Sequence, residues 1–214
     1  MASSFDISHI IDYLKQMGIK IAHVDYERST LELAFHGDHG QWRMIIGVQQ
    51  KADASKLMLI VPHFSSVTPK KRLECLEALL AVNYRIAIGK FGLDLEDGEV
   101  RLEETFPLAN NTITFRQFQL AFSAIIQTVA IYHSLLPRII YGNVSVQEAL
   151  HACEQEFFHT ARHQESTMAE KLHDRLQEDA PLAGSGTSEH SEREELDIND
   201  VLAEVTRMLE ERKE

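Results

Sequence analysis

Apolar residues recur at helical spacing in several stretches of the chain, and each of these stretches predicts an amphipathic helix. The first has its apolar positions at Ile7, Ile10, Ile11, Leu14 and Met17, and Gly18 ends it. A second helix is predicted from Pro69, with one apolar stripe at Leu73, Leu76, Leu79 and Leu80. We expect the next residues, Asn83, Tyr84 and Arg85, to form a short link to a strand.

Strand-like alternation of apolar and polar residues lies between the predicted helices. The runs 19–26, 30–35, 42–48 and 57–61 are joined by short loops, which favours an antiparallel meander. After the second helix, a further strand leads to the turn Glu96-Asp97-Gly98, where glycine reaches the left-handed conformation at least cost. The strand that follows alternates polar residues with Val100, Leu102 and Phe106.

The longest predicted helix begins behind Thr114, which has capping-box spacing to Gln117. Its apolar face extends almost all the way round, so we expect it to be buried in the core or in a subunit interface. Another helix begins at Ser145, again with capping-box spacing to Glu148, and becomes polar toward about residue 177. The order α-ββββ-α-ββ-α predicts an α+β fold with an antiparallel curved sheet packed against helices, followed by a C-terminal helical extension.

Charge is unevenly distributed along the 214 residues. Residues 164–214 contain 15 Asp and Glu against 6 Lys and Arg, whereas residues 1–163 contain 18 against 15. The tail also lacks aromatic residues, so it cannot bury much surface. We divide the chain into an α+β domain (1–142), a helical extension (143–178), a flexible acidic linker (179–195) and an amphipathic helix (196–214). The apolar stripe of this last helix consists of Ile198, Val201, Leu202, Val205, Met208 and Leu209.

Composition argues against several classes of function. An acidic chain without a basic stripe is a poor nucleic-acid binder, because such binding needs Lys and Arg to displace counterions from phosphates. We find no leader and no apolar run of about 18 residues, so we expect a cytoplasmic protein that binds no membrane. Cys75 and Cys153 are too few for a secreted disulfide scaffold, and Cys75 is predicted to be a core thiol. The scattered glycines form neither a P-loop nor a dinucleotide fingerprint.

His159 and His163 are the strongest candidates for metal ligands. They stand one helical turn apart, with Glu156 one turn earlier, and two imidazoles and a carboxylate at that spacing suit a metal ion. A solvated polar helix face explains the same residues, and Thr160 stands where a zinc-protease motif has glutamate. We therefore assign no metal ligand and no cofactor.

The remaining candidate chemistry is weaker still. His36 and His39 flank a loop aspartate, and polar side chains in such a turn usually face the solvent. His63 stands near Ser65 and Ser66, but no nucleophile-elbow motif surrounds these serines. We therefore expect that the protein is not an enzyme.

The segment LECLEALLAVNYRIAIGKFGLDLEDGEVRLEETFPL (73–108), with the following NNTITFRQFQLAFSAIIQTV, resembles the YbjN family. The fold of that family is similar to the type III secretion chaperones. In it, a leucine-rich helix and an Asn-containing link precede a "gkf-ld-edGevr" hairpin and a long closing helix. The resemblance covers roughly residues 5–140. It implies a curved sheet packed against helices, a homodimer and a role in binding other proteins, and it supplies no catalytic motif.

These observations predict a non-enzymatic, chaperone- or adaptor-like module that binds another protein segment in the bacterial cytoplasm. We expect a homodimer formed through the long helix or the adjoining hairpin, and partner binding by strand addition or helix packing. The candidate contact residues are Trp42, Phe64, Phe91, Val201, Val205 and Met208. Two alternatives stay open: a regulatory or sensory protein autoinhibited by its acidic tail, and a metal-binding protein that uses the 159–163 histidine pair.

Overall fold

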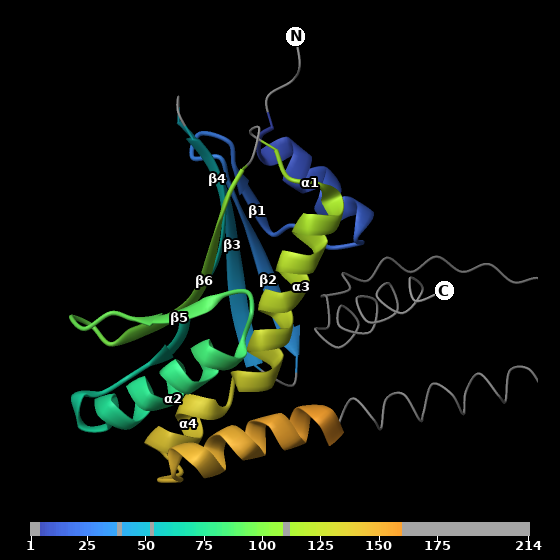
Figure 1. Ribbon diagram of the computed structural model, residues 1–214. Coiled ribbons are helices and arrows are strands. Elements are labelled where there is room, and N and C mark those ends of the chain that lie inside the picture. Colours follow the sequence, from blue (N-terminus) through green and yellow to red (C-terminus); the bar gives the residue numbers. More distant parts are fainter. Residues whose placement is uncertain (1–4, 38–39, 52–53, 109–111, 160–214) are drawn as a thin grey trace, which may run out of the picture.

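The computed structural model describes residues 5–37, 40–51, 54–108 and 112–159 (Figure 1). The elements follow the order α1 (Ile7–Gln16), β1 (His23–Asp25), β2 (Thr30–Gly37), β3 (Gly40–Lys51), β4 (Ala54–Ser66), η1 (Pro69–Lys71), α2 (Arg72–Arg85), β5 (Lys90–Leu93), β6 (Glu99–Pro107), α3 (Phe115–Tyr132) and α4 (Leu135–Ile140). A further helix covers residues 146–159. The predicted element order and the α+β class are confirmed. The linker 179–195 and the helix 196–214 lie outside the described residues.

All six strands join in one antiparallel sheet of order β1-β2-β3-β4-β6-β5. Alternate residues of the central strands point to a single face and are buried there, as Leu33, Met44 and Leu59 illustrate. Helices α1 and α3 lie over this face (Figure 1), and their apolar residues complete the core. The sheet is therefore covered on one side by helices, which is the arrangement that the alternation in the sequence predicts.

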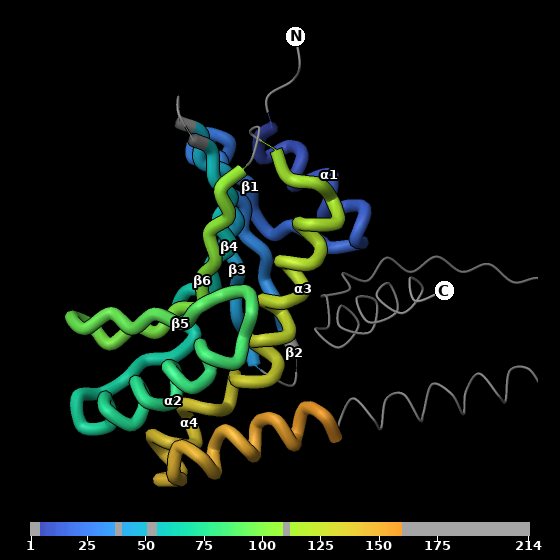
Figure 2. The backbone as a smooth tube through the Cα atoms, in the orientation of Figure 1, coloured from blue at the N-terminus to red at the C-terminus, as the bar shows by residue number. Residues whose placement is uncertain are grey.

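A bulge in β4 bends the sheet. Val61 pairs with Leu102 and Ser65 pairs with Val100, which leaves residues 62–64 opposite Arg101 alone. His63 sits at the bulge with a φ of 50°, a backbone angle that residues other than glycine rarely adopt. The pairs between β3 and β4 end at Ile60, so beyond this point β4 pairs with β6 only. Figure 2 shows the β5–β6 hairpin turned away from the main sheet, with α2 beside it.

Several predicted boundaries were wrong. The predicted strand 19–26 is reduced to the three residues of β1, and β3 and β4 are both longer than the apolar runs that predicted them. Asn83, Tyr84 and Arg85 are the last turn of α2 and form no link; the helix ends only where Ile86 turns extended. Their weak helix propensity is overridden by tertiary contacts, chiefly those that Asn83 makes to β5.

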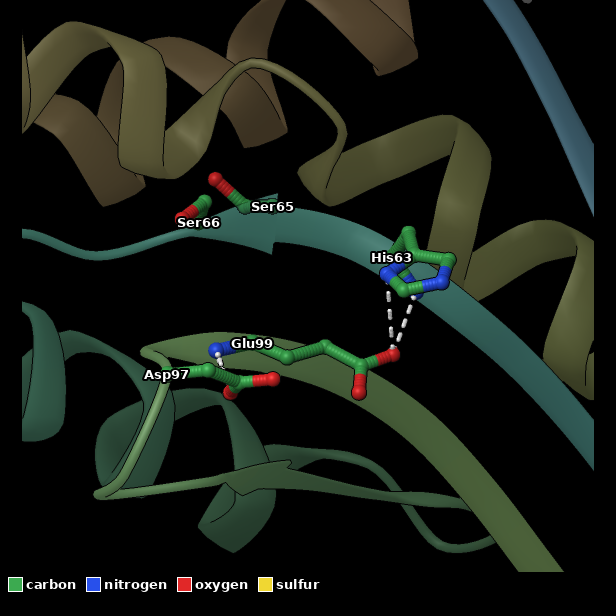
Figure 3. A pocket seen from close by; sticks show the side chains of 5 residues that line it. All are labelled: His63, Ser65, Ser66, Asp97 and Glu99. Carbon is green, nitrogen blue, oxygen red and sulfur yellow. Dashed lines mark hydrogen bonds and ion pairs between the residues drawn. The ribbon is translucent and has the colours of Figure 1, made fainter.

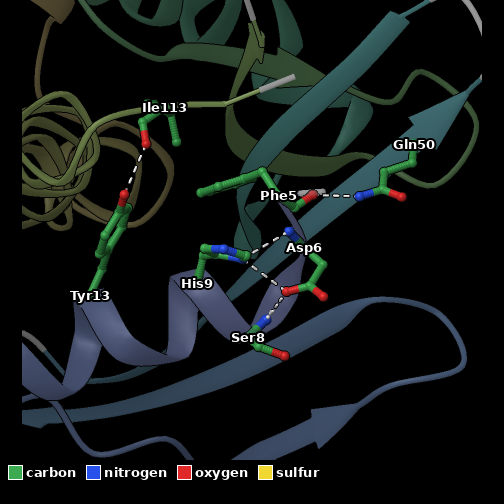
Figure 4. A network of polar contacts seen from close by, with 7 residues as sticks. All are labelled: Phe5, Asp6, Ser8, His9, Tyr13, Gln50 and Ile113. Carbon is green, nitrogen blue, oxygen red and sulfur yellow. Dashed lines mark hydrogen bonds and ion pairs between the residues drawn. The ribbon is translucent and has the colours of Figure 1, made fainter. Parts of the chain in front are cut away.

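Helix α1 is fastened to the sheet and to α3 by a polar network (Figure 4). The Asp6 side chain accepts a hydrogen bond from the Ser8 amide, and His9 Nδ1 accepts one from the Asp6 amide. The Gln50 amide side chain of β3 donates to the Phe5 carbonyl oxygen. Tyr13 Oη donates to the carbonyl oxygen of Ile113, just before α3, at 3.0 Å. Helix α1 is thus held by hydrogen bonds both to the sheet and to the segment that leads into α3.

Residues 146–159 pack along the body, although the extension falls outside the resemblance. The predicted capping box is present: the Glu148 amide donates to Ser145 Oγ at 3.3 Å. The buried side chains of this helix are Ala149, Leu150 and Cys153. An ion pair joins Glu154 to Arg85 at the end of α2, and Tyr132 Oη of α3 donates to Glu154 at 3.1 Å.

The stretch Phe115–Ile140, which includes α3 and α4, is long and apolar enough to cross a membrane by length and composition. The sequence expectation counted uninterrupted apolar residues and missed it. In the structure, 56% of its most apolar window is buried. Packing against the sheet accounts for this apolar character.

We expect Gly98→Ala to destabilise the fold by at least about 2 kcal/mol. Gly98 has a φ of 78°, and a Cβ atom there would lie 2.3 Å from the carbonyl oxygen of Val67. Gly92→Ala is the matched control on the same hairpin, because a Cβ at Gly92 has no atom within 4 Å and its φ is not positive. Denaturant unfolding of both variants measures the difference, and equal stabilities would contradict the predicted turn strain.

The titration of Tyr132 tests whether residues 146–159 pack as described. Burial, and after it the Glu154 carboxylate, raises the pKa of Tyr132 to about 12. Because this value exceeds the unfolded pKa of about 10, the stabilising contribution is complete below pH 10 and is lost as the pH rises toward 12. We expect one phenolate absorbance step near pH 12 that disappears in Tyr132→Phe. If Tyr132→Phe instead removes absorbance change near pH 10, this tyrosine is not buried.

Candidate functional site

Helix α2 presents two apolar faces, and the described part of the chain covers one of them. Its buried side chains are Cys75, Ala78, Leu79 and Val82. Its exposed apolar side chains are Leu73 (77% exposed), Leu76 (38%), Leu80 (71%) and Tyr84 (92%). We call these last four residues the α2 outer face. They recur at i, i+3, i+7 and i+11, so they form one stripe along the helix.

The predicted stripe of four leucines was therefore wrong as a single face. Leu79 belongs to the core, whereas Leu73 and Leu80 point away from it. The core side of α2 uses the small side chains of Cys75 and Ala78, which allow close packing but contribute little to a pattern judged by its leucines. Tyr84 was missed because it was assigned to a link, although its spacing of four residues from Leu80 is helical.

The surroundings of α2 explain why one face stays uncovered. On one side, the β5–β6 hairpin packs against α2, and Arg72 Nη2 donates to the Leu95 carbonyl oxygen at 3.3 Å. On another side, Asn143 and Glu154 bind the two ends of α2 through Lys71 and Arg85. The remaining face is the stripe itself. The Leu95 side chain (61% exposed) adds a further apolar group on the hairpin.

Four large apolar side chains on one helix face form a contiguous surface. Single exposed leucines are normal on soluble proteins, but an aligned group marks an interaction site. Burying one leucine side chain contributes about 1.5–3 kcal/mol. The α2 outer face therefore offers enough burial energy for binding a second helix, and its polar groups are the Tyr84 hydroxyl and the exposed Glu77 beside Leu73 and Leu80.

The neighbouring sheet edge is closed to strand addition. Asn83 Nδ2 donates to the Phe91 carbonyl oxygen at 3.0 Å, and the Phe91 amide donates to Asn83 Oδ1 at 2.7 Å. One side chain thus satisfies the two outward backbone groups of Phe91, in the middle of the short β5 edge, as a neighbouring strand would. The opposite edge, β1, has only three residues. Of the two binding modes that the sequence suggested, helix packing is the one for which the structure offers a surface.

The uncovered face of the main sheet is a weaker candidate. Ile45 pairs with Ile60 at its centre, and both side chains are half-buried. The same cross-strand row continues into Glu32 on one side and Glu103 on the other. Flanking carboxylates limit the apolar area of this patch, so we regard α2 as the principal site.

A shallow polar notch of about 260 Å³ lies at the β4 bulge, lined by His63, Ser65, Ser66, Asp97 and Glu99 (Figure 3). Glu99 Oε1 accepts a hydrogen bond from the His63 amide at 3.0 Å and lies 3.2 Å from His63 Nδ1. Figure 3 shows both serine side chains set apart from the His63 ring. The histidine is paired with Glu99 and not with a serine, so this group holds the bulge and is not a nucleophile-base pair.

Of the candidate metal ligands, the structure describes Glu156 and His159. Arg138 Nη2 donates to both carboxylate oxygens of Glu156 at 2.6 Å. His159 is the last residue that the structure describes, and His163 lies outside the described residues. Within the described ranges, no group of three or more His, Cys, Asp or Glu could hold a metal ion. His39 is also outside these ranges.

The two cysteines are buried free thiols. Cys75 is fully buried, which confirms the predicted core thiol. Burial raises the pKa of both thiols, Cys75 and Cys153, and therefore disfavours the reactive thiolate.

The aromatic residues suggested as contact residues lie in or against the core. Phe91 is buried, and its ring lies 4.8 Å from that of the half-buried Phe64. Trp42 stacks on Phe35 with ring centroids 4.1 Å apart. The three other candidates, Val201, Val205 and Met208, are outside the described residues. The role of all six in binding stays a prediction.

The comparisons with known proteins place this fold in a family. The YbjN family model, described as "Putative bacterial sensory transduction regulator", matches residues 6–134. The chain belongs to the YbjN family. The resemblance noted in the sequence is confirmed, and the YbjN match includes α2, the β5–β6 hairpin and α3.

Among solved structures, the chain is similar to the "Crystal structure of YbjN, a putative transcription regulator from E. coli". The two share 14% sequence identity with a TM-score of 0.45, and the match covers 62% of this chain and 95% of the other. No match was found among curated proteins.

Leu79→Ala and Leu80→Ala test the assignment of the two faces of α2. We expect Leu79→Ala to cost about 2–5 kcal/mol because it leaves a cavity in the core. Leu80→Ala should change stability by less than about 0.5 kcal/mol, because Leu80 is exposed. Denaturant unfolding compares the two variants. A loss for Leu80→Ala as large as that for Leu79→Ala would mean that Leu80 belongs to the core.

Proposed function

We propose that this YbjN-family protein is a non-enzymatic, cytoplasmic regulator that binds another protein through the α2 outer face. The observation that carries the proposal is the exposed stripe from Leu73 to Tyr84 on an otherwise well-packed helix. The printed description of the family as a regulator of sensory transduction supports the same class of function.

An amphipathic helix is the partner element that fits this surface best. The stripe from Leu73 to Tyr84 spans twelve residues, about 16 Å or three helical turns. A partner helix with apolar residues at i, i+3, i+4 and i+7 would bury it along its whole length. Strand addition is disfavoured because Asn83 occupies the outward backbone groups of Phe91 in β5.

A homodimer is a second candidate use of the same surface. Ten of the 18 residues of α3 are buried, which leaves the long helix little free apolar area apart from Leu120. The hairpin side of the molecule, which includes α2 and Leu95, offers more. Of the two dimer contacts that the sequence suggested, we therefore favour the one beside the hairpin.

Leu73→Glu combined with Leu80→Glu tests the proposal in full-length protein. Two carboxylates in the stripe would remove most of the burial energy and add a desolvation cost. We expect at least a tenfold loss of a specific partner in affinity capture from source-cell lysate, read by quantitative mass spectrometry. The unfolding midpoint should stay close to that of the unchanged protein, because both leucines are exposed.

Leu120→Glu is the matched control, since Leu120 is exposed on α3, away from the stripe. A protein captured by the unchanged chain and by Leu120→Glu, but lost with the double variant, supports binding through α2. Identical captured proteins for all three baits would refute it. Light scattering of the same variants separates a second copy of the chain from a different partner.

A further inference from the structure

The C-terminal segment matches the α2 outer face in length and pattern. Its apolar positions run from Ile198 to Leu209, which is twelve residues, the same span as Leu73 to Tyr84. Both stripes therefore cover about 16 Å of helix. An isolated helix of this length is marginal in water, so the segment needs an apolar surface to pack on.

The described part of the chain ends close to α2. Asn143 Oδ1 accepts a hydrogen bond from Lys71 Nζ at 3.0 Å near the start of α2, and Glu154 pairs with Arg85 at its end. The helix over residues 146–159 therefore runs alongside α2 in the same direction, as Figure 1 shows. Residue 159 lies only five residues, or about 8 Å, beyond Glu154.

The linker is long enough to return to α2. Residues 160–195 connect the end of the described helix to the C-terminal segment. The predicted flexible linker, residues 179–195, has 17 residues and spans at most about 56–61 Å when extended. This exceeds the length of α2, which is about 21 Å for 14 residues. The segment can reach the whole stripe without strain.

The charges of the two surfaces are complementary. Residues 69–85 contain four Lys and Arg against two Glu, and residues 196–214 contain six Asp and Glu against three Lys and Arg. The cations lie at the two ends of α2, in 70–72 and at Arg85. Acidic residues likewise flank the C-terminal stripe, at 194–197 and at 210–211. Residues 210–214 also contain Arg212 and Lys213, so the net charge is acidic at both ends of the C-terminal stripe and basic at the start of α2, where 70–72 lie.

We propose that residues 196–214 dock as a helix on the α2 outer face of the same chain and regulate access to it. This inference rests on the proposed function, because the tail regulates the α2 outer face by competing with a partner that binds to it. Docking covers the exposed leucines and brings acidic residues of the tail near the cations at the ends of α2. A partner binds by displacing the tail.

Chemical labelling of a probe cysteine in the full chain tests this docking. Tyr84→Cys places a thiol in the stripe, while the two native thiols are buried and react slowly. Its maleimide reaction rate is measured with the natural tail and with the tail variant Val205→Glu, Met208→Glu. We expect at least a tenfold faster reaction with the variant tail, because a site covered nine-tenths of the time reacts at one-tenth of its free rate.

A charge-matched tail provides the control. Asn199→Glu with Ala203→Glu adds the same two negative charges outside the apolar stripe, so it should leave the slow rate unchanged. A second probe, Leu120→Cys on α3, should react equally with all tails. Equal rates at Tyr84→Cys for the natural and the Val205→Glu, Met208→Glu tails would overturn the proposal. A rate that rises on dilution would also overturn it, since a second copy would then cover α2.

The same variants separate this inference from the proposed function. If the tail variant leaves labelling unchanged while Leu73→Glu with Leu80→Glu still removes the partner, tail docking fails and partner binding stands. If labelling shows docking but no captured protein depends on the stripe, the tail is the occupant of α2 and the proposed partner binding fails. If both hold, the Val205→Glu, Met208→Glu chain captures more partner than the natural chain.

Discussion

The bulge in β4 is the constraint on which the position of α2 depends. His63 has a left-handed backbone conformation. Its amide donates a hydrogen bond to the Glu99 carboxylate, which stabilises this conformation. Beyond this point β4 leaves β3, so the chain enters α2 away from the main sheet. Helix α2 then packs on the β5–β6 hairpin, on α4 and beside residues 146–159, and no element of the described residues covers its outer face. An exposed apolar helix face is the direct consequence of this bend.

Asn83 completes the arrangement by closing the sheet beside that face. Its side chain bonds both outward groups of Phe91, which removes the free edge of β5 and fixes the end of α2 against the hairpin. An open edge next to an apolar helix would favour uncontrolled strand pairing. With the edge closed, a partner binds by packing its apolar side chains on the α2 outer face. Such a partner element is amphipathic.

The sequence was sufficient for the fold but not for the site. Periodicity and capping boxes identified the order of the elements, because buried faces such as that of α3 repeat over many residues. The α2 outer face could not be identified from the sequence, because α2 has apolar residues on two sides and the pattern does not show which side is buried. Only tertiary contacts decide that Leu79 is covered while Leu80 is not. The bulge at His63 and the Asn83 bonds depend on residues 36 and 8 positions apart, which local patterns do not contain.

Weak docking of the tail is sufficient for regulation. A flexible linker holds its segment at an effective concentration of about 1 mM. A segment with an intrinsic Kd of about 0.1 mM would then cover α2 for about nine-tenths of the time, and would weaken a partner's apparent affinity about tenfold. That Kd corresponds to about −5.5 kcal/mol, which a few leucine-sized contacts supply. A tail that bound much more tightly would block partner binding to the α2 outer face. The few apolar residues of the tail, with acidic residues around them, therefore suit weak docking that a partner can reverse.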